Sequence, residues 1–313
     1  MDQDEKNLLN AVGRIDDWKG KRIEHEMVPG GATNPNWKVT VGDGKAYFVK
    51  IPGRGTESFI DRDNAHIANE IAAEVGIGPA VYYYFEDTGV EVFEWLEGYR
   101  TLNFGDVFSK LTFHNIIGTI RKFHQYKGTN LPLTQTPFAQ TFAMMRLAGE
   151  LGGYMPPEID RMEWLAQKIE EAVVIAGIDY VPCHNDHWTG NYLYSEATGD
   201  LRIADFEYAS MNDECWDFAI MSATNYFTEA MDKEWIRYYY GEHDEKRFAR
   251  LKLYKILCDI RWAMWSIVQA QQSSLQSFDY YSWFGTKMAR LRQFWNDPRL
   301  DYWLNLVKGV SAF

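Results

Sequence analysis

Two patterns of hydrophobic and polar positions divide the chain. Over residues 37–95, short runs rich in β-branched and aromatic residues are separated by turn signals, which is typical of β-strands. We predict two hairpins there, one turning at residues 42–44 and the other at residues 87–89. Between the hairpins, apolar residues recur every four positions over residues 61–75 and indicate one amphipathic helix. The N-terminal part is therefore predicted to be a small sheet with one helix.

After residue 98 the pattern changes, and apolar residues recur at helical spacing. Residues 116–123 and 158–174 are examples, and the same spacing continues through the last part of the chain, which is rich in Trp and Tyr. We therefore expect an α+β fold, with a β-rich N-terminal part over residues 1–98 and a larger, mainly α-helical part over residues 99–313.

A short hairpin, predicted from residues 191–194 and 201–207, interrupts the helical part. Antiparallel pairing would place Asn191, at the start of one strand, beside Asp205, at the end of the other. Asp186 lies five residues before Asn191. An amide and a carboxylate supply oxygen ligands suited to Mg²⁺, and a separate aspartate can accept the proton of an attacking hydroxyl. Asp186, Asn191 and Asp205 have the spacing of kinase catalytic and metal loops. In the alternative interpretation Asp186 caps a loop and Asp205 lies in an ordinary turn. That alternative requires three separately placed residues to match the kinase spacing by coincidence.

Composition and charge exclude several classes of protein. With 313 residues, 46% of them hydrophobic, the chain can bury one large core or two smaller ones, and it is neither disordered nor fibrous. A formal net charge of −12 argues against a nucleic-acid partner. We expect neither an export signal nor membrane insertion, because no apolar stretch approaches the length of a bilayer span. Three scattered cysteines favour a reducing compartment, and we expect a cytoplasmic protein.

Three motifs resemble those of the choline/ethanolamine kinase family, within the wider aminoglycoside-phosphotransferase and protein-kinase-like group. HNDHWTGN at residues 184–191 is similar to the family's H-N-D-x3-G-N pattern, and IADFEYA at residues 203–209 is similar to I-D-F-E-Y. RWAMWSIVQA at residues 261–270 resembles a C-terminal helix with paired tryptophans. The resemblance spans nearly the whole chain and implies a protein-kinase-like bilobal fold, in which residues 1–98 bind the nucleotide and residues 99–313 carry catalysis and the acceptor.

The resemblance implies a Mg·ATP-dependent transferase that phosphorylates the hydroxyl of a small amino alcohol, choline or ethanolamine. Asp186 would be the catalytic base, with Asn191 and Asp205 as the Mg²⁺ ligands. Glu207 would be a further carboxylate near the metal or the substrate, and Asp217 would support the catalytic loop. ATP and Mg²⁺ are the implied cofactors.

A nucleotide loop is expected immediately before the first strand, where residues 30–37 are GGATNPNW. Glycine and small polar residues let backbone N–H groups approach phosphate oxygens, although an ordinary turn would have the same composition. The segment resembles the family's Gly-Gly-x-Ser/Thr-Asn loop. The residues that the resemblance assigns to the ATP phosphates are Thr33, Asn34, Asn36 and Lys50.

A kinase lysine usually pairs with a helix glutamate. Glu70 and Glu74 on the following helix are the candidates for this role beside Lys50. We assign Glu70, although the family places its acid nearer position 65, where this chain has Ala65. The segment that ends the strand-rich part occupies the position of a kinase hinge. There, backbone groups around Glu94 and Leu96 are expected to bind adenine.

Aromatic residues form the expected acceptor site. Proteins hold quaternary ammonium groups over aromatic faces, and Trp262 and Trp265, three apart on a predicted helix, share one side of it. Aromatic residues at this spacing are also common in ordinary cores. The residues assigned to the acceptor are Trp188, Glu207, Tyr208, Trp262 and Trp265.

Two departures from the family leave the acceptor open. Trp188 stands where eukaryotic members tend to have glutamine, and Thr224 stands where many have a substrate glutamate. The alternatives are the same chemistry on an aminoglycoside, a sugar or a thiamine-like alcohol, or a catalytically silent nucleotide-binding protein with a kinase fold. The sequence does not indicate the oligomeric state or the pathway.

Overall fold

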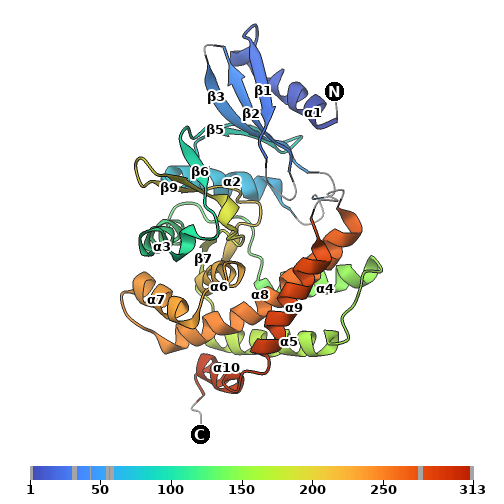
Figure 1. The fold of residues 1–313 in the computed structure, drawn as a ribbon, viewed down its shortest axis with the longest axis vertical. Helices are drawn as coiled ribbons and strands as arrows, with labels where there is room; N and C mark the ends of the chain where they lie inside the picture. The colour runs from blue at the N-terminus through green and yellow to red at the C-terminus, as the bar shows by residue number, and fades with distance from the viewer. Residues whose placement is uncertain are drawn as a thin grey trace. The chain divides into compact units, whose positions relative to one another are not determined.

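A computed structural model describes the chain as two compact units (Figure 1). Unit 1 comprises Met1–Leu131 and Trp188–Ala209, and unit 2 comprises Pro132–His187 and Ser210–Phe313. The residues that the structure describes are 3–29, 34–42, 44–53, 56, 60–273 and 278–310.

A five-stranded antiparallel sheet is the main feature of unit 1. Its strand order is β1-β2-β3-β5-β4. The strands are β1 (Ile23–Met27), β2 (Asn36–Val41), β3 (Lys45–Lys50), β4 (Val81–Phe85) and β5 (Val90–Glu94). The β2–β3 and β4–β5 hairpins confirm the two hairpins predicted from the sequence. One face of the sheet packs on helix α1 (Gln3–Val12) and the 3-10 turn η1 (Asp16–Trp18), which bury Leu8 and Trp18 against it.

Helix α2 (Arg62–Glu74) is the amphipathic helix expected between the hairpins. Its N-cap is Asp61, whose side chain accepts a hydrogen bond from the Asn64 N–H at 2.9 Å. Three of the six residues that α2 buries are alanines, which allow close packing; the six are Asn64, Ala65, Ala68, Asn69, Ile71 and Ala72.

A second, three-stranded sheet completes unit 1. It joins β6 (Tyr99–Thr101), β8 (Tyr192–Ser195) and β9 (Leu201–Ile203), with helix α3 (Lys110–His124) and the 3-10 turns η2 (Asp106–Phe108) and η3 (Thr189–Asn191). The last strand of the five-stranded sheet along the chain ends at Glu94, four residues before the boundary expected after residue 98. The compact unit extends further because β6 pairs with β8 and so ties the later hairpin to the N-terminal part.

Unit 2 is mainly helical, as expected. Its elements are α4 (Pro137–Glu150), α5 (Ile159–Ala176), α6 (Glu214–Thr224), α7 (Glu229–Tyr240), α8 (Glu245–Gln272), α9 (Tyr280–Phe294) and α10 (Leu300–Lys308), with a small sheet of β7 (Tyr180–Cys183) and β10 (Ser210–Asp213). Helix α8 is the centre of this unit, because every residue from 251 to 269 is buried. Three of its buried charges form ion pairs: Lys252 and Lys255 lie against Asp232, and Asp259 accepts from Arg290 Nε at 2.6 Å.

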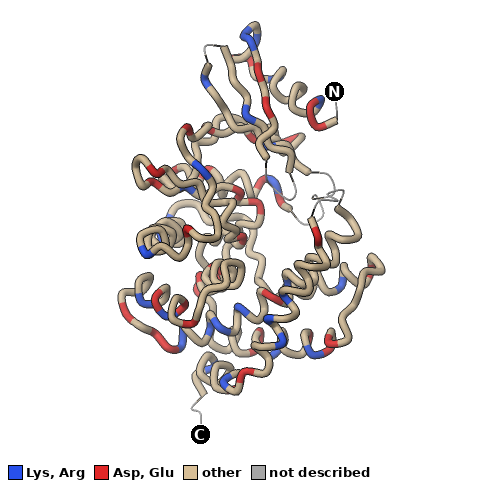
Figure 2. Tube along the Cα trace, in the orientation of Figure 1, with Lys and Arg blue, Asp and Glu red and all other residues tan. Residues whose placement is uncertain are grey.

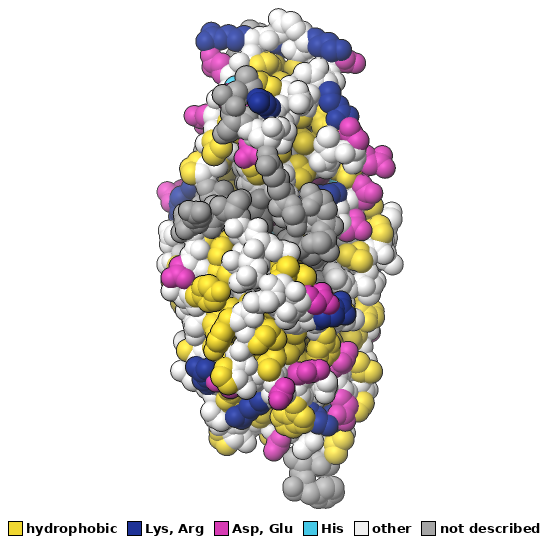
Figure 3. Space-filling model, turned by 90° about the vertical axis from the view of Figure 1, so that its right-hand side faces the viewer, with side chains coloured by type: hydrophobic (Ala, Val, Ile, Leu, Met, Phe, Trp, Pro, Cys, Tyr) yellow, Lys and Arg dark blue, Asp and Glu magenta, His cyan; other side chains and the backbone are white. Residues whose placement is uncertain are grey.

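Charged residues of both signs are interspersed along the chain trace of each unit (Figure 2). On the face shown in Figure 3, hydrophobic side chains are also visible between charged ones. None of the described helices is both long and apolar enough to cross a membrane.

Candidate active site

The hairpin of β8 and β9 brings Asn191 and Asp205 together, as the sequence predicts. Tyr192 pairs with Ile203, and the Ala204 N–H donates to the Asn191 carbonyl at 2.8 Å, so the two residues leave the hairpin side by side. Asp205 has a φ of 67°, which is a left-handed conformation that costs about 1–2 kcal/mol for a residue other than glycine. Such strained residues cluster at functional sites.

Lys50 ends strand β3, and its ammonium lies among carboxylates. Its Nζ is 2.5 Å from Asp205 Oδ1 and 3.0 Å from Glu207 Oε1. Burial by itself lowers the pKa of Lys50, but the negative charges of Asp205 and Glu207 outweigh burial and hold this pKa above its ordinary value. Lys50 is therefore a fixed positive charge, as a residue that holds phosphate oxygens must be.

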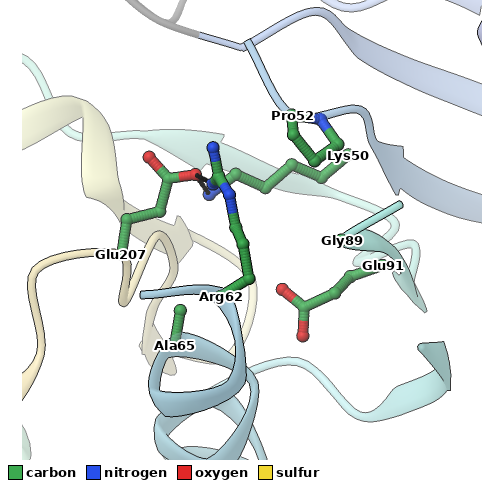
Figure 4. A pocket seen from close by; sticks show the side chains of 7 residues that line it. All are labelled: Lys50, Pro52, Arg62, Ala65, Gly89, Glu91 and Glu207. Atoms are coloured by element: carbon green, nitrogen blue, oxygen red, sulfur yellow. Dashed lines mark hydrogen bonds and ion pairs between the residues drawn. The ribbon is translucent and has the colours of Figure 1, made fainter. Parts of the chain in front are cut away.

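Glu207 is the most enclosed carboxylate of this cluster, with a side chain that is 5% exposed. It accepts from Asn34 Nδ2 at 2.9 Å. Lys50 and Arg62 also lie against it, with Arg62 Nη1 2.5 Å from its Oε1 (Figure 4). The Asn34 side chain also accepts from the Gly53 N–H at 2.8 Å, which links the end of the predicted nucleotide loop to Glu207. Two cations and an amide thus satisfy a carboxylate that would be costly to bury alone.

The other residues predicted to bind the nucleotide lie in different parts of the structure, or outside the residues that it describes. Asn36 begins β2 and lies opposite Lys50 in the register of β2 and β3. Thr33 lies outside the described residues. At the expected hinge, the Glu94 N–H donates to the Ala80 carbonyl at 2.9 Å, so that N–H is already bonded; Leu96 follows β5 and is half-buried.

The structure does not bring Glu70 to Lys50. Its side chain is 60% exposed and lies 3.6 Å from His66 Nε2, because position 70 falls outside the buried side of α2. Among the described residues, the carboxylates that reach the Lys50 ammonium are those of Asp205 and Glu207.

Two further charged residues lie near this cluster and were not predicted from the sequence, Arg62 and Glu91. Arg62 is the first residue of α2, where the helix dipole disfavours a cation, and that unusual position was a usable signal. Glu91 is a buried acid in β5, whose first four residues are all buried. An acid within an otherwise apolar strand is rarely buried without a partner, and this pattern was also visible in the sequence.

The catalytic-loop motif lies in unit 2 up to His187, and Asp217 holds it. The Asp217 carboxylate is fully buried in the first turn of α6 and accepts from the N–H groups of His184 at 2.9 Å and Asn185 at 2.8 Å. His187 Nε2 lies 3.1 Å from it. This confirms the supporting role expected for Asp217. Asp186 is half-buried between buried neighbours, and its N–H donates to His184 Nδ1 at 3.1 Å.

Trp262 and Trp265 pack together within unit 2. Their ring centroids are 5.3 Å apart at an interplanar angle of 76°, and Tyr280 at the start of α9 lies 5.9 Å from Trp265. Each tryptophan is 8% exposed, so the pair belongs largely to the core and keeps a small accessible area. Two further residues assigned to the acceptor, Trp188 and Tyr208, belong to unit 1, where Trp188 is exposed and Tyr208 is half-buried.

The sequence of the chain matches a family model. The model describes choline/ethanolamine kinase and covers residues 25–295. The chain belongs to the choline/ethanolamine kinase family. A probable choline kinase 1 of Arabidopsis thaliana is 24% identical over 94% of this chain and 93% of the relative, and an ethanolamine kinase 1 of Mus musculus is 23% identical over 88% and 84%, respectively. The chain is accordingly an ATP-dependent kinase of a small alcohol.

Solved structures share the fold. A choline/ethanolamine kinase family protein of Mesorhizobium loti has a TM-score of 0.82 at 23% identity, covering 98% of this chain and all of the other. A choline kinase of Streptococcus pneumoniae has a TM-score of 0.76 at 24% identity, covering 92% and 99%. A spectinomycin phosphotransferase has a TM-score of 0.60 at 12% identity over 96% and 97%. These similarities confirm the protein-kinase-like fold expected from the motifs.

Proposed function

We propose that this kinase transfers the γ-phosphoryl group of Mg·ATP to the hydroxyl of choline or ethanolamine. The observation that carries the proposal is the group formed by Lys50, Asp205 and Glu207 next to Asn191. It combines a fixed positive charge with oxygen ligands. Phosphoryl transfer needs chiefly positioning and charge neutralisation, and these groups supply both.

The donor set fits Mg²⁺. Carboxylate and amide oxygens are its preferred protein ligands, and Asn191 and Asp205 offer one of each. Asp205 and Glu207 also form a negatively charged site that attracts cations. In the structure the cationic side chains of the protein itself lie there, Lys50 against both carboxylates and Arg62 against Glu207. Asn191 and Asp205 would hold the ion, with Glu207 beside them, and the ion would neutralise charge on the phosphate oxygens.

In this mechanism each residue has a distinct task. Lys50 binds phosphate oxygens by charge, and Asn34 fixes the adjoining loop. Asp186 accepts the proton of the acceptor hydroxyl, or orients that hydroxyl, from a loop that Asp217 holds in place before substrate binds. Adenine would lie at the hinge, against the Glu94 carbonyl and the Leu96 backbone.

An amino alcohol as the acceptor is supported by family membership and by the Trp262–Trp265 pair. Cations are stabilised over aromatic faces, and a trimethylammonium or ammonium group would contact the part of Trp262 and Trp265 that stays accessible, 8% of each residue. Trp188, Tyr208 and Glu207 are further candidates for contacts with it. The position at which many relatives carry a substrate glutamate is Thr224, which is buried in α6, so the aromatic rings would contribute most of the recognition.

The proposal is tested by measuring ADP release from Mg·ATP with choline, ethanolamine, N-methylated ethanolamines, aminoglycosides and simple sugars. We expect turnover with choline or ethanolamine and a loss of about 10²–10⁴-fold in Asp186→Ala. The control is Glu86→Gln, an exposed change, which should turn over like the wild type. Turnover with only an aminoglycoside or a sugar would refute the acceptor. If Asp186→Ala retained more than about a tenth of the rate, Asp186 would not be the base.

A further inference from the structure

A small cavity beside Lys50 is lined by more charged side chains than the proposed mechanism uses. It lies within unit 1, and its lining includes Lys50, Arg62, Ala65, Glu91 and Glu207 (Figure 4). Lys50, Arg62 and Glu207 already form ion pairs there. Glu91 is a fourth charged group, only 5% exposed, with no task in the mechanism described above.

Glu91 faces Lys50 from the neighbouring strand. The two residues are direct partners in the antiparallel register of β3 and β5. Side chains of directly opposed residues stand on the same side of a sheet with Cβ atoms about 5 Å apart. Lys50 and Glu91 accordingly emerge together toward one space, which both of them line.

Helix α2 fixes Glu91 instead of supplying an acid itself. In protein kinases a helix glutamate pairs with the strand lysine, but the residues that α2 presents to this cavity are Arg62 and Ala65, and neither is an acid. Two other residues of α2 bind the Glu91 carboxylate, His66 Nδ1 at 3.0 Å and Asn69 Nδ2 at 2.9 Å. The His66 ring in turn stacks on Tyr84 with centroids 4.0 Å apart. Both oxygens of Glu91 are therefore held in place.

We propose that Glu91 is a positioning residue for the ATP phosphates and replaces the helix acid of other kinases from strand β5. The Lys50 ammonium now lies against Asp205 and Glu207, two carboxylates that the proposed function assigns to the metal site. When those carboxylates serve the nucleotide, Glu91 is the remaining acid behind Lys50 that keeps its side chain extended toward phosphate. The inference rests on the proposed function for this use of Asp205 and Glu207.

Nucleotide binding without any acceptor tests this role. Calorimetry would compare ADP, a non-hydrolysable ATP analogue and adenosine, each with Mg²⁺, on the wild type and on Glu91→Gln, which keeps the shape but removes the charge. We expect both phosphorylated ligands to bind about tenfold more weakly, equivalent to about 1.4 kcal/mol, and adenosine to bind as before. Glu86→Gln, an exposed change in the same unit, is the matched control and should alter none of the three. Unchanged ADP binding, or an equal loss for adenosine, would overturn the proposal.

Two further variants separate positioning from general damage. If Glu91 acts through Lys50, Glu91→Gln should cost nothing more in a Lys50→Met background, whereas an equal loss in both backgrounds would contradict the inference. In Ala65→Glu/Glu91→Gln, the acid returns to the helix, and ADP affinity should recover in a protein that melts like the wild type. No recovery in such a folded variant would overturn the replacement. Because binding is measured without an acceptor, these results are independent of whether choline or ethanolamine is the substrate.

Discussion

Lys287 on α9 is a buried amine whose removal should stabilise the protein. Its residue exposure is 0%, its Nζ has no hydrogen-bond partner among the described residues, and it lies 4.2 Å from the centroid of the Trp283 ring. Burial, followed by repulsion from Arg290, lowers the pKa of Lys287 from 10.5 to about 8, and the attraction of Asp259 offsets this only in part. One pKa unit corresponds to about 1.4 kcal/mol, so the charged form costs the folded state about 3 kcal/mol at pH 7.

Lys287→Met has a similar length and removes the charge. We expect its free energy of unfolding at pH 7 to exceed that of the wild type by about 2–3 kcal/mol, measured by urea denaturation. The difference should depend on pH. Because the folded-state pKa lies below the unfolded one, the unfolded wild type binds more protons between these values. Wild-type stability therefore rises from about pH 8 to 10.5, and the advantage of the variant shrinks there.

The comparison between the variant and the wild type cancels the titration of groups that do not interact with Lys287. Lys246→Met, an exposed change at the start of α8, is the control and should stay within about 0.5 kcal/mol of the wild type at each pH. Lys287→Met that is no more stable than the wild type at pH 7 would refute the reasoning. A constant difference between pH 7 and 10.5 would do the same, because it would show that packing and not charge is responsible.

Three other substitutions test the site. Asp217→Ala leaves two buried N–H groups of the catalytic loop without their acceptor, so we expect a loss of about 2–4 kcal/mol in urea unfolding together with a lower kcat; a normal kcat would separate loop order from catalysis. Asp205→Ala should raise the Mg²⁺ concentration needed for half-maximal activity, and an unchanged Mg²⁺ dependence would remove it from the metal site. Trp262→Ala should raise the KM for choline by about 3–30-fold and the KM for ethanolamine less, while Trp262→Phe retains most of the affinity; equal increases would assign Trp262 to the core alone.

The sequence predicted those features that depend on neighbours along the chain. Both hairpins of the N-terminal sheet, helix α2 and the β8–β9 hairpin follow from alternation, turn residues and helical spacing. Asn191 and Asp205 could be placed together because one short hairpin determines their separation. Strand β1 and helix α1 were not predicted, since the polar faces of these short elements mask their periodicity.

The predictions were wrong or incomplete where packing between distant elements decides. Glu70 has the residue type and helix expected of a lysine partner, but the rotation of α2 against the sheet leaves it exposed. The positions of Glu91 and Arg62 near Lys50 depend on the β3–β5 register and on where α2 meets the cavity. A single sequence carries little information on either relation.

The burial of α8 affects how the acceptor preference of this enzyme can change. The helix carries Trp262 and Trp265, and all of its residues from 251 to 269 are enclosed. A substitution at either tryptophan is therefore expected to alter the folding free energy of unit 2 as well as the proposed contacts with the acceptor, and most variants would be lost through instability before a new substrate was gained. Trp188 is exposed on a loop and is not enclosed in this way. Adaptation to a different alcohol is therefore expected to begin at Trp188, and changes in the paired tryptophans should follow only with compensating changes in the surrounding helices.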